Sequence, residues 1–425
     1  MTTPRDRGEA SEGTRPTRVG VFGLLGSGNL GNDGSLAVVL SYLRERHPDA
    51  VVDFMCMGPE TIAGRYRLPA IPLHWYYAKP RPGGRLWTVV LKSLGKLIDL
   101  PRTFRWVRRH DVVIVPGMGV LEAELPLRAW GFPYMLFLLA LAGRLFRTKV
   151  ALVSVGANVM RARMTRWFFG RAARLAHYRS FRDERSREAV RAMGVPTEFD
   201  PVYPDLVYAM PVPSGDRGIR PNRTVGVGVM AYRGGNEDRA RADEIHESYV
   251  STMGEFVGWL VDADRPVRLF TGDRADLASA EEIAAHVLDR RPGADVSVVP
   301  LASLEDVLSG MASVRSVVAT RYHNVLCALK VVKPTVSLGY APKNDVLMRD
   351  MGLGAYCQQL RSLDLARLKE QFTEVEQRET ELRAVMVARN AEFATLLDDQ
   401  FQSLSAQLFP ARRDAGPPVQ QILEA

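Results

Sequence analysis

The residues with the clearest chemical potential are Arg321 and His323, in the run Arg321-Tyr322-His323-Asn324. This run separates an apolar stretch typical of a strand from one typical of a helix, so we expect it at the start of a helix. The N–H groups of a first helical turn have no intrahelical partner and favour phosphate or carboxylate. Arg321 would add a forked, permanently charged donor, and His323 a proton donor. The run predicts an anion site with acid catalysis; the alternative is a histidine that only caps the helix.

A glycine-rich segment follows the first expected strand, Arg18 to Phe22, and precedes a helix that we expect to begin near Ser35. Its spacing differs from that of the dinucleotide fingerprint, so a purely structural tight turn is as good an explanation as a ligand loop. The polar side chains of Asn29, Asn32 and Asp33 favour a ligand loop for a sugar. The glycines that would allow a close backbone approach are Gly26, Gly28, Gly31 and Gly34.

Other candidates also follow expected strands. Gly117 and Gly119 form a second glycine turn after the strand Asp111 to Val115, where a backbone edge for a ligand and an ordinary turn are equal alternatives. Arg182 closes a short strand and would direct a fixed charge towards the same place. Lys343 follows another strand and is a candidate phosphate contact, with a solvated lysine as the alternative. Several strands therefore deliver cationic or glycine-rich ends to one region.

These candidates require a scaffold of alternating strands and helices. Short β-branched runs alternate with longer helical patterns in both halves of the chain, which is typical of parallel βαβ units. We therefore predict an α/β protein with two Rossmann-like, doubly wound parallel-sheet domains that face a cleft. Ligands of such sheets bind at the carboxyl ends of the strands, which is where the candidate residues fall.

The segment near Tyr203 is rich in proline and glycine and separates the two patterns. It sets the expected boundary between an N-terminal domain and a C-terminal domain. The expected divisions are a disordered lead over 1–17, the first domain over 18–205, a linker over 206–222, the second domain over 223–359, a helical segment over 360–408 and a loose tail over 409–425.

Composition bounds the function. The chain has 425 residues, 46% of them hydrophobic and 24% charged, which is typical of a globular protein. Cys56, Cys327 and Cys357 have neither disulfide nor zinc-site spacing, so we expect a reducing cytoplasm and no metal. No recognisable nucleic-acid module accompanies the basic charge, so we expect no nucleic-acid partner.

Basic charge is concentrated in the first half. From Lys79 to Arg109 there are nine Lys or Arg against one acid, and from Arg144 to Arg182 there are ten and no acid. With nearby tryptophans, this pattern fits either an ordinary solvated face or a face for an anionic membrane. The apolar run Phe132 to Leu141 is too short to span a bilayer and indicates a buried helix. We expect a cytoplasmic protein that can associate peripherally with the inner face of the membrane.

In this arrangement the chain resembles the polysaccharide pyruvyl transferases, over roughly Val19 to Leu353. An ordered set of motifs is more specific than any one of them. In the loop, Asn32 stands where that family commonly has an acid, and Asp33 follows. The matching pieces are Gly28-Asn29-Leu30-Gly31-Asn32-Asp33, Gly117-Met118-Gly119, Phe181-Arg182-Asp183 with Ser186, Asp200-Pro201, Arg321-Tyr322-His323, Pro334, and Tyr340 to Lys343.

The resemblance implies a fold like that of GT-B glycosyltransferases and transfer of an enolpyruvyl group from phosphoenolpyruvate to sugar hydroxyls, usually as a cyclic ketal. The acceptor would be a cell-envelope polysaccharide or a lipid-linked glycolipid precursor, with phosphoenolpyruvate as co-substrate and no other cofactor. The N-terminal domain would be the acceptor side and the C-terminal domain the donor side. Arg321 and His323 would be catalytic. The expected donor contacts are Arg182, Arg321, Tyr322, His323, Asn324 and Lys343, and the expected acceptor contacts are Gly28, Asn29, Asn32, Asp33, Gly117 and Gly119.

Two rival functions fit the same scaffold. One is a glycosyltransferase that uses a nucleotide sugar, for which the sequence offers no clear ribose-binding acid or diphosphate clamp. The other is a non-catalytic protein that binds a saccharide or a partner. The presence of Arg321 and His323 counts against it, and the departure at Asn32 counts modestly for it.

Overall fold

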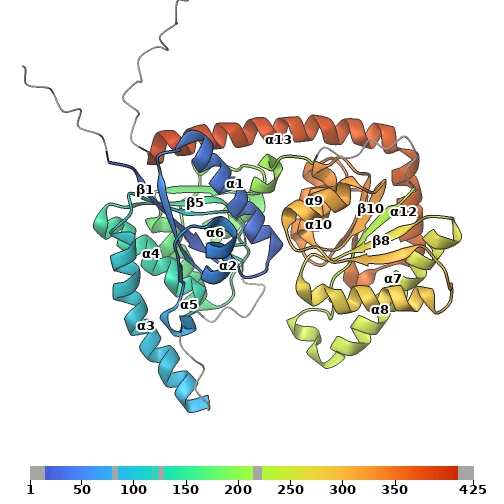
Figure 1. The fold of residues 1–425 in the computed structure, drawn as a ribbon, viewed down its shortest axis with the longest axis horizontal. Helices are drawn as coiled ribbons and strands as arrows, with labels where there is room; N and C mark the ends of the chain where they lie inside the picture. The colour runs from blue at the N-terminus through green and yellow to red at the C-terminus, as the bar shows by residue number, and fades with distance from the viewer. Residues whose placement is uncertain (1–14, 79–84, 118, 123–128, 214–222, 410–425) are drawn as a thin grey trace, which may run out of the picture.

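The chain forms two parallel β-sheets of six strands each, both covered by helices (Figure 1). The computed structural model describes residues 15–78, 85–117, 119–122, 129–213 and 223–409. Every strand pairing in both sheets is parallel. The prediction of two Rossmann-like parallel-sheet domains is confirmed.

The first sheet has the strand order β3-β2-β1-β4-β5-β6. Helices connect its strands on both faces, because a right-handed crossover changes face when the direction of strand addition reverses. The strands are β1 Arg18–Gly23, β2 Val51–Cys56, β3 Ala70–Pro72, β4 Val112–Val115, β5 Lys149–Val155 and β6 Tyr178–Phe181. The helices are α1 Leu30–Arg46, α2 Pro59–Tyr66, α3 Arg85–Val107, α4 Phe132–Phe146, α5 Arg163–Leu175 and α6 Glu184–Ala192, with short 3-10 turns η1 Trp75–Ala78 and η2 Leu206–Ala209.

The second sheet repeats the same topology, in the order β12-β11-β10-β7-β8-β9. Its first strand and its fourth, β7 and β10, lie side by side, as β1 and β4 do in the first sheet. The strands are β7 Val225–Gly228, β8 Val267–Phe270, β9 Val296–Val299, β10 Ser316–Ala319, β11 Thr335–Gly339 and β12 Cys357–Gln359. The helices are α7 Ala242–Asp262, α8 Leu277–Leu288, α9 Leu304–Ala312, α10 Tyr322–Lys330 and α11 Pro342–Asp350, with 3-10 turns η3 Asn236–Arg241, η4 Arg274–Asp276 and η5 Leu360–Ser362.

The start of α1 differs from the prediction. The helix begins at Leu30, five residues before the expected start near Ser35. Asn29 is the N-cap, and its side chain accepts hydrogen bonds from the N–H groups of Gly31 and Asn32. A capping side chain of this kind stabilises a helix start even when glycines follow, which the sequence reasoning missed. The second half of the glycine-rich segment is therefore a helix N-terminus.

The apolar run from Phe132 lies in α4, which is almost completely buried between α3 and α5. A buried helix needs no polar face, which explains its composition. Among the residues that the structure describes, none of the helices combines the length and apolar character needed to cross a bilayer.

The two domains share a hydrophobic core. One buried cluster runs from α1 through η2 into the second domain. Helices α12 Leu365–Gln377 and α13 Glu379–Leu408 return the chain to the first domain, and α13 extends along one side of both (Figure 1). In α13, Phe401 stacks on Tyr42, and Gln400 bonds to Ser154 and Ser180. These contacts hold the two carboxyl edges towards each other.

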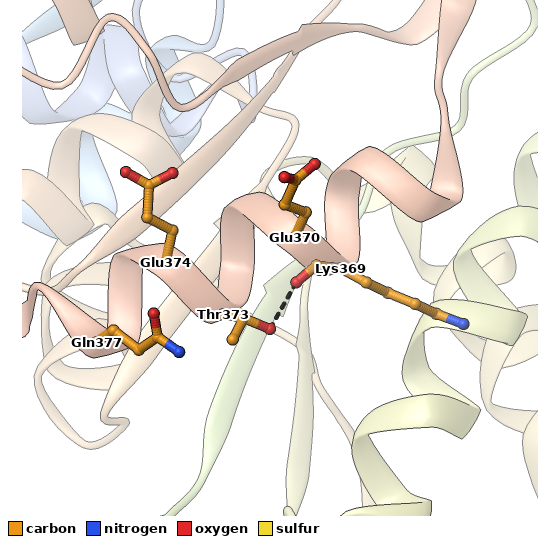
Figure 2. Close-up of a pocket in the computed structure, with 5 residues that line it drawn as sticks. All are labelled: Lys369, Glu370, Thr373, Glu374 and Gln377. Carbon is orange, nitrogen blue, oxygen red and sulfur yellow. Dashed lines mark hydrogen bonds between the residues drawn. The ribbon is translucent and has the colours of Figure 1, made fainter.

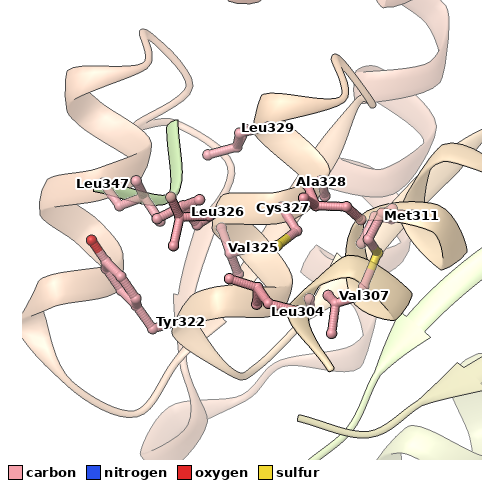
Figure 3. Close-up of a cluster of buried hydrophobic side chains, with 14 of the residues drawn as sticks. Leu304, Val307, Met311, Tyr322, Val325, Leu326, Cys327, Ala328, Leu329 and Leu347 are labelled. Carbon is pink, nitrogen blue, oxygen red and sulfur yellow. The ribbon is translucent and has the colours of Figure 1, made fainter. Parts of the chain in front are cut away.

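Helix α10, which carries the Arg321-to-Asn324 run, is fixed by apolar packing on its far side. Leu326 and its neighbours pack against Leu304, Val307 and Met311 of α9 and Leu347 of α11 (Figure 3). Because protein interiors are close-packed, this contact fixes the direction of the first turn of the helix.

Candidate functional site

The candidate residues lie where strands of both sheets end. Glycine-rich turns follow β1 and β4, Arg182 follows β6, and the segments with Arg321 and Lys343 follow β10 and β11. In an open α/β sheet the carboxyl edge is the ligand-binding edge, especially beside the point where the strand order reverses. β1 and β4 form that point in one domain, and β7 and β10 form it in the other.

His323 of α10 lies directly over the first turn of α1. A Cβ atom added to Gly31 would collide with its imidazole ring, so only glycine allows this approach. The ring keeps some exposed surface but is surrounded by protein atoms. Burial lowers the pKa of His323 to about 4. Asp205 acts against this shift and Arg182 adds to it. The imidazole is therefore neutral at neutral pH in this arrangement.

Arg182 is the centre of a buried ion cluster. Its guanidinium pairs with the carboxylate of Glu122 and lies 3.4 Å from a carboxylate oxygen of Asp183 and 3.9 Å from one of Asp205. Burial acts against the charge, but these carboxylates raise the pKa of Arg182 well above its ordinary value. A stable cation with three acidic neighbours therefore closes the first domain's side of the site.

Lys343 and Tyr322 connect this cluster to the second domain. The ammonium of Lys343 lies 3.4 Å from an oxygen of Glu122, across the domain boundary. Tyr322 is buried, with the guanidinium of Arg182 at 4.8 Å and the ammonium of Lys343 at 5.9 Å from its ring centroid. Its ring also meets that of His323 edge-on, with centroids 5.1 Å apart. The ring of Tyr322 thus contacts the cations of Arg182 and Lys343 as well as the imidazole of His323.

Arg321 points in another direction. Its Nε lies 3.0 Å from an oxygen of Asp276, which is completely buried, and a second nitrogen pairs with the other carboxylate oxygen. The Arg321 side chain remains 26% exposed, so one edge of the guanidinium still faces solvent. Tyr340 connects Arg321 to the rest of the site. It raises the pKa of Arg321, and its ring centroid lies 5.3 Å from the ammonium of Lys343.

Asn324 lies inside the second domain, away from the first. Its side chain is completely buried beside Gly228 and Gly272, which have no room for a Cβ atom. Within the described part of the chain its amide nitrogen and oxygen have no hydrogen-bond partner. Burying an amide without a hydrogen-bond partner costs free energy. Packing alone therefore does not explain why a polar residue occupies this position.

The glycine-rich segment after β1 uses most of its polar side chains to hold its own shape. Asn32 donates to the carbonyl of Leu24 at 3.2 Å, and Asp33 accepts from the N–H of Gly26 at 2.9 Å. Asn29 caps α1, as described above. Gly28 has a φ of +87° and nothing near its missing Cβ. The surfaces that this segment can offer a ligand are therefore mainly backbone.

The glycine turn after β4 packs closely against β5 and Glu122. A Cβ atom on Gly117 would lie 2.8 Å from the carbonyl oxygen of Ser154. On Gly119 it would lie 2.7 Å from a carboxylate oxygen of Glu122. Both glycines thus allow the turn to fit against β5 and leave room for Glu122.

Glu122 is the residue that the sequence reasoning missed. It pairs with Arg182 in its own domain and Lys343 in the other. Burial raises the pKa of Glu122, but these cations outweigh that effect and hold it below its usual value. The available signal was an acid following the Gly117 turn, at the carboxyl end of a central strand.

A small cavity lies beside Arg182, Asp205, Tyr322 and Lys343, where the two domains meet. Its volume is about 30 Å³, which is room for about one water molecule. A larger groove of about 410 Å³ lies on the outer surface of α12, away from these residues (Figure 2). It is lined by Lys369, Glu370, Thr373, Glu374 and Gln377. Over the described ranges, no group of three or more His, Cys, Asp or Glu side chains is arranged so that it could hold a metal ion.

The order of these motifs matches a known family. A sequence profile of polysaccharide pyruvyl transferase matches residues 29–342, about three quarters of the chain. This chain belongs to the polysaccharide pyruvyl transferase family. The match includes the cap of α1, Glu122, Arg182 and the start of α10, and it ends one residue before Lys343. A search of curated protein sequences gave no significant match.

Several solved structures share this fold. HepE of Anabaena, in complex with UDP and glucose, superposes with a TM-score of 0.55 at 11% identity over 92% of this chain and 99% of its own. UDP-GlcNAc 2-epimerase of Neisseria meningitidis, bound to UDP-GlcNAc, has a TM-score of 0.57 at 11% identity over 91% and 100%. That of Methanocaldococcus jannaschii has 0.55 at 9% over 85% and 91%. At these identities the likeness establishes the GT-B-like fold alone.

Proposed function

We propose that this family member transfers the pyruvyl group of phosphoenolpyruvate to a saccharide of the cell envelope and forms a pyruvate ketal. Membership of a family of transferases that act on polysaccharide supports the class of reaction. The observation that carries the donor assignment is the position of His323 between cations of two domains, over the N-terminus of α1. In this proposal the reaction takes place in the cytoplasm.

Phosphoenolpyruvate has a phosphate and a carboxylate, so its site needs cations on two sides. We assign one side to Arg182 and Lys343, which lie beside Tyr322, and the other to the exposed edge of Arg321. The pairing of Arg321 with Asp276 would hold its guanidinium in one orientation, which favours recognition of a planar anion. The first turn of α10 adds unpaired N–H groups.

His323 would act as the general acid. A bound dianion would raise the pKa of His323 from its low value in the ligand-free arrangement, so donor binding itself would charge the imidazole. The imidazolium would then protonate the methylene carbon of phosphoenolpyruvate, which leaves an oxocarbenium-like centre at C2. An acid of this kind contributes about a hundred- to ten-thousand-fold in rate.

The remaining steps balance with one acceptor. A sugar hydroxyl attacks C2 and loses its proton, which gives a tetrahedral carbon that still carries phosphate. A second hydroxyl of the same sugar attacks C2, the C–O bond to phosphate breaks, and phosphate leaves with the second proton. The products are a cyclic ketal with a new methyl group, and inorganic phosphate.

Asp205 and Glu122 are the candidate bases for the acceptor hydroxyls. Both are carboxylates beside Arg182, and both raise the pKa of His323. Glu237, an acid of the second domain, pairs with Arg361 on the exposed turn η3, so we do not assign it a role. The acceptor would lie on the first domain, against the backbone at Gly28 and the turn of Gly117 and Gly119.

Donor binding at this cavity would require its walls to move apart. A cavity of about 30 Å³ is too small for phosphoenolpyruvate, and Glu122 occupies the cations that its anions would need. We therefore propose that the donor enters an open form and replaces Glu122 as the partner of Lys343.

A second candidate function is glycosyl transfer from a nucleotide sugar. It is favoured by the fold of HepE, whose structure contains UDP and glucose, and of an epimerase bound to UDP-GlcNAc. A third is a non-catalytic saccharide- or partner-binding protein, which would need no acid beside an anion site.

Parallel calorimetric titrations separate the candidates. Phosphoenolpyruvate, UDP-glucose and UDP-GlcNAc would each be titrated into the wild-type protein and His323→Gln. Saturable heat with phosphoenolpyruvate in both proteins, and none with the nucleotide sugars, is the expected result. Heat with a nucleotide sugar alone would favour the glycosyltransferase. Binding of phosphoenolpyruvate with no release of its phosphate in the presence of any saccharide acceptor would favour the binding protein.

A further inference from the structure

Helix α3 presents an apolar stripe to solvent. Val90, Leu94 and Leu97 recur at helical spacing, so they lie on one face, and Leu97 is 73% exposed. A helix of 23 residues is roughly 35 Å long, about twice the length of the strands that it covers. Figure 1 shows its first half projecting beyond the body of the first domain. Packing within the domain therefore does not explain why these positions are apolar.

Exposed apolar side chains also gather on the neighbouring helices. Trp130, just before α4, is 52% exposed, and Trp167 and Met164 of α5 are 47% and 49% exposed. Aromatic contacts connect them: the Trp130 ring lies 5.4 Å from that of Phe168, which lies 5.2 Å from that of Trp167. Helix α4 packs against both α3 and α5, so the two apolar groups belong to one helical layer. We call them together the α3–α5 surface.

The exposed charges of helices α3 and α5 have one sign. Arg163, Arg166 and Arg171 are exposed beside Trp167, and the guanidinium of Arg171 lies 5.7 Å from its ring. No acid occurs anywhere from Arg144 to Arg182. The single acid of α3, Asp99, is buried and bonded to His74. Apolar and tryptophan side chains ringed by arginines match an anionic lipid surface, which accepts the apolar groups and attracts the bases.

The α3–α5 surface lies on the same edge of the domain as the candidate site. Both sheets are parallel, so α3, α4 and α5 all begin at the carboxyl edge, where Glu122 and Arg182 also lie. Trp130 and Met164 are within the first turns or the approaches of their helices. A membrane that contacts this surface would therefore face the rim of the cleft.

We propose that the α3–α5 surface docks the protein on an anionic membrane, with the apolar stripe of α3 and Trp167 inserted among the headgroups. A second copy of the chain is the alternative occupant of an apolar face. It would bring the same arginines against each other without acids to balance them, so charge favours the lipid. This inference concerns a surface outside the proposed donor site and does not depend on the reaction.

Vesicle sedimentation of the full chain tests the proposal. The vesicles would be phosphatidylcholine alone and phosphatidylcholine mixed with phosphatidylglycerol, at low and high salt. We expect binding to the mixed vesicles that weakens with salt, because exposed charges are screened. Leu94→Ser with Leu97→Ser should lower the partition coefficient about tenfold or more, because those side chains would no longer leave water.

Two further variants make the result specific. Arg163→Ser with Arg166→Ser should also lower binding to the mixed vesicles, whereas Val387→Ser, which changes an apolar residue 56% exposed on α13, should not. The proposal is overturned if the wild-type protein fails to sediment with the mixed vesicles at low salt, or if the α3 variant binds like the wild type. If the wild type forms a dimer that the α3 variant does not form, and the wild type does not bind vesicles, the surface is assigned to a second copy.

Discussion

The two domains hold their cations differently at the site where they meet, and we call their two contributions the first and the second wall. On the first domain, Arg182 is 5% exposed and lies among Glu122, Asp183 and Asp205. On the second, Arg321 is 26% exposed and pairs with one carboxylate, that of Asp276. A cation buried among carboxylates is needed for the fold of its wall, whereas a cation with an exposed edge can meet a ligand without leaving its partner. The charges of the two walls should therefore respond differently to substitution.

The largest expected effect is at the histidine between the walls. His323→Gln removes the proton donor but keeps a polar side chain over Gly31, so turnover should fall by about a hundred- to ten-thousand-fold. Binding of phosphoenolpyruvate should persist, because Arg182, Arg321 and Lys343 remain. Phosphate release in a single turnover, with a panel of saccharide acceptors, measures the first effect and calorimetry the second. Undiminished phosphate release would remove His323 from the mechanism.

On the first wall, Arg182→Gln should mainly lower stability. It leaves Glu122 and Asp205 buried without their cation, which costs about 3 to 5 kcal/mol in the free energy of unfolding. Urea denaturation measures the loss, with Arg171→Gln as a control because that arginine is exposed on α5. If Arg182→Gln is as stable as the control, the ion cluster does not hold this wall together.

On the second wall, Arg321→Gln should weaken phosphoenolpyruvate binding about tenfold to a hundredfold, the usual value of a charge-assisted hydrogen bond. Arg321→Lys should restore little of it, because an ammonium cannot both pair with Asp276 and present a second donor edge. Calorimetry on both variants measures this. Wild-type affinity in Arg321→Gln would place the donor on the first wall alone.

Glu122 joins the two walls, and its removal should sharpen the contrast. Glu122→Gln frees Arg182 and Lys343 from a competing negative charge, so phosphoenolpyruvate should bind about tenfold more tightly. If Glu122 is also the base, turnover falls in the same variant. Weaker binding would contradict the idea that this carboxylate occupies the donor's place.

The last expected effect is the pH dependence of stability at His323. Its pKa is about 4 in the folded protein and near 6.5 in the unfolded chain, so between these values only the unfolded chain is protonated. The stabilising contribution is therefore complete above pH 6.5 and is lost as the pH falls towards 4. Urea denaturation of the wild type and His323→Gln should show a difference that shrinks over this window. A difference independent of pH would contradict the lowered pKa.

The sequence predicted the fold class because both halves carry the repeated strand-and-helix pattern, and the strands expected over Arg18 to Phe22 and Asp111 to Val115 form within one residue of those bounds. It could not predict which way side chains two residues apart would face. Arg321 and His323 were expected to act together, yet the N-cap position directs one towards Asp276 and the other towards Gly31. Glu122 was missed because its partners, Arg182 and Lys343, are 60 and 221 residues away in the chain.

The most direct test of the central claim is whether phosphoenolpyruvate binding charges His323. Phosphoenolpyruvate would be titrated into the wild type and His323→Gln near pH 6, in two buffers with different enthalpies of ionisation. We predict that the wild type takes up more protons on binding than the variant does, because the dianion raises the pKa of an imidazole that is neutral beforehand. Equal proton uptake by the two proteins would contradict the assignment of His323 as the acid beside the donor.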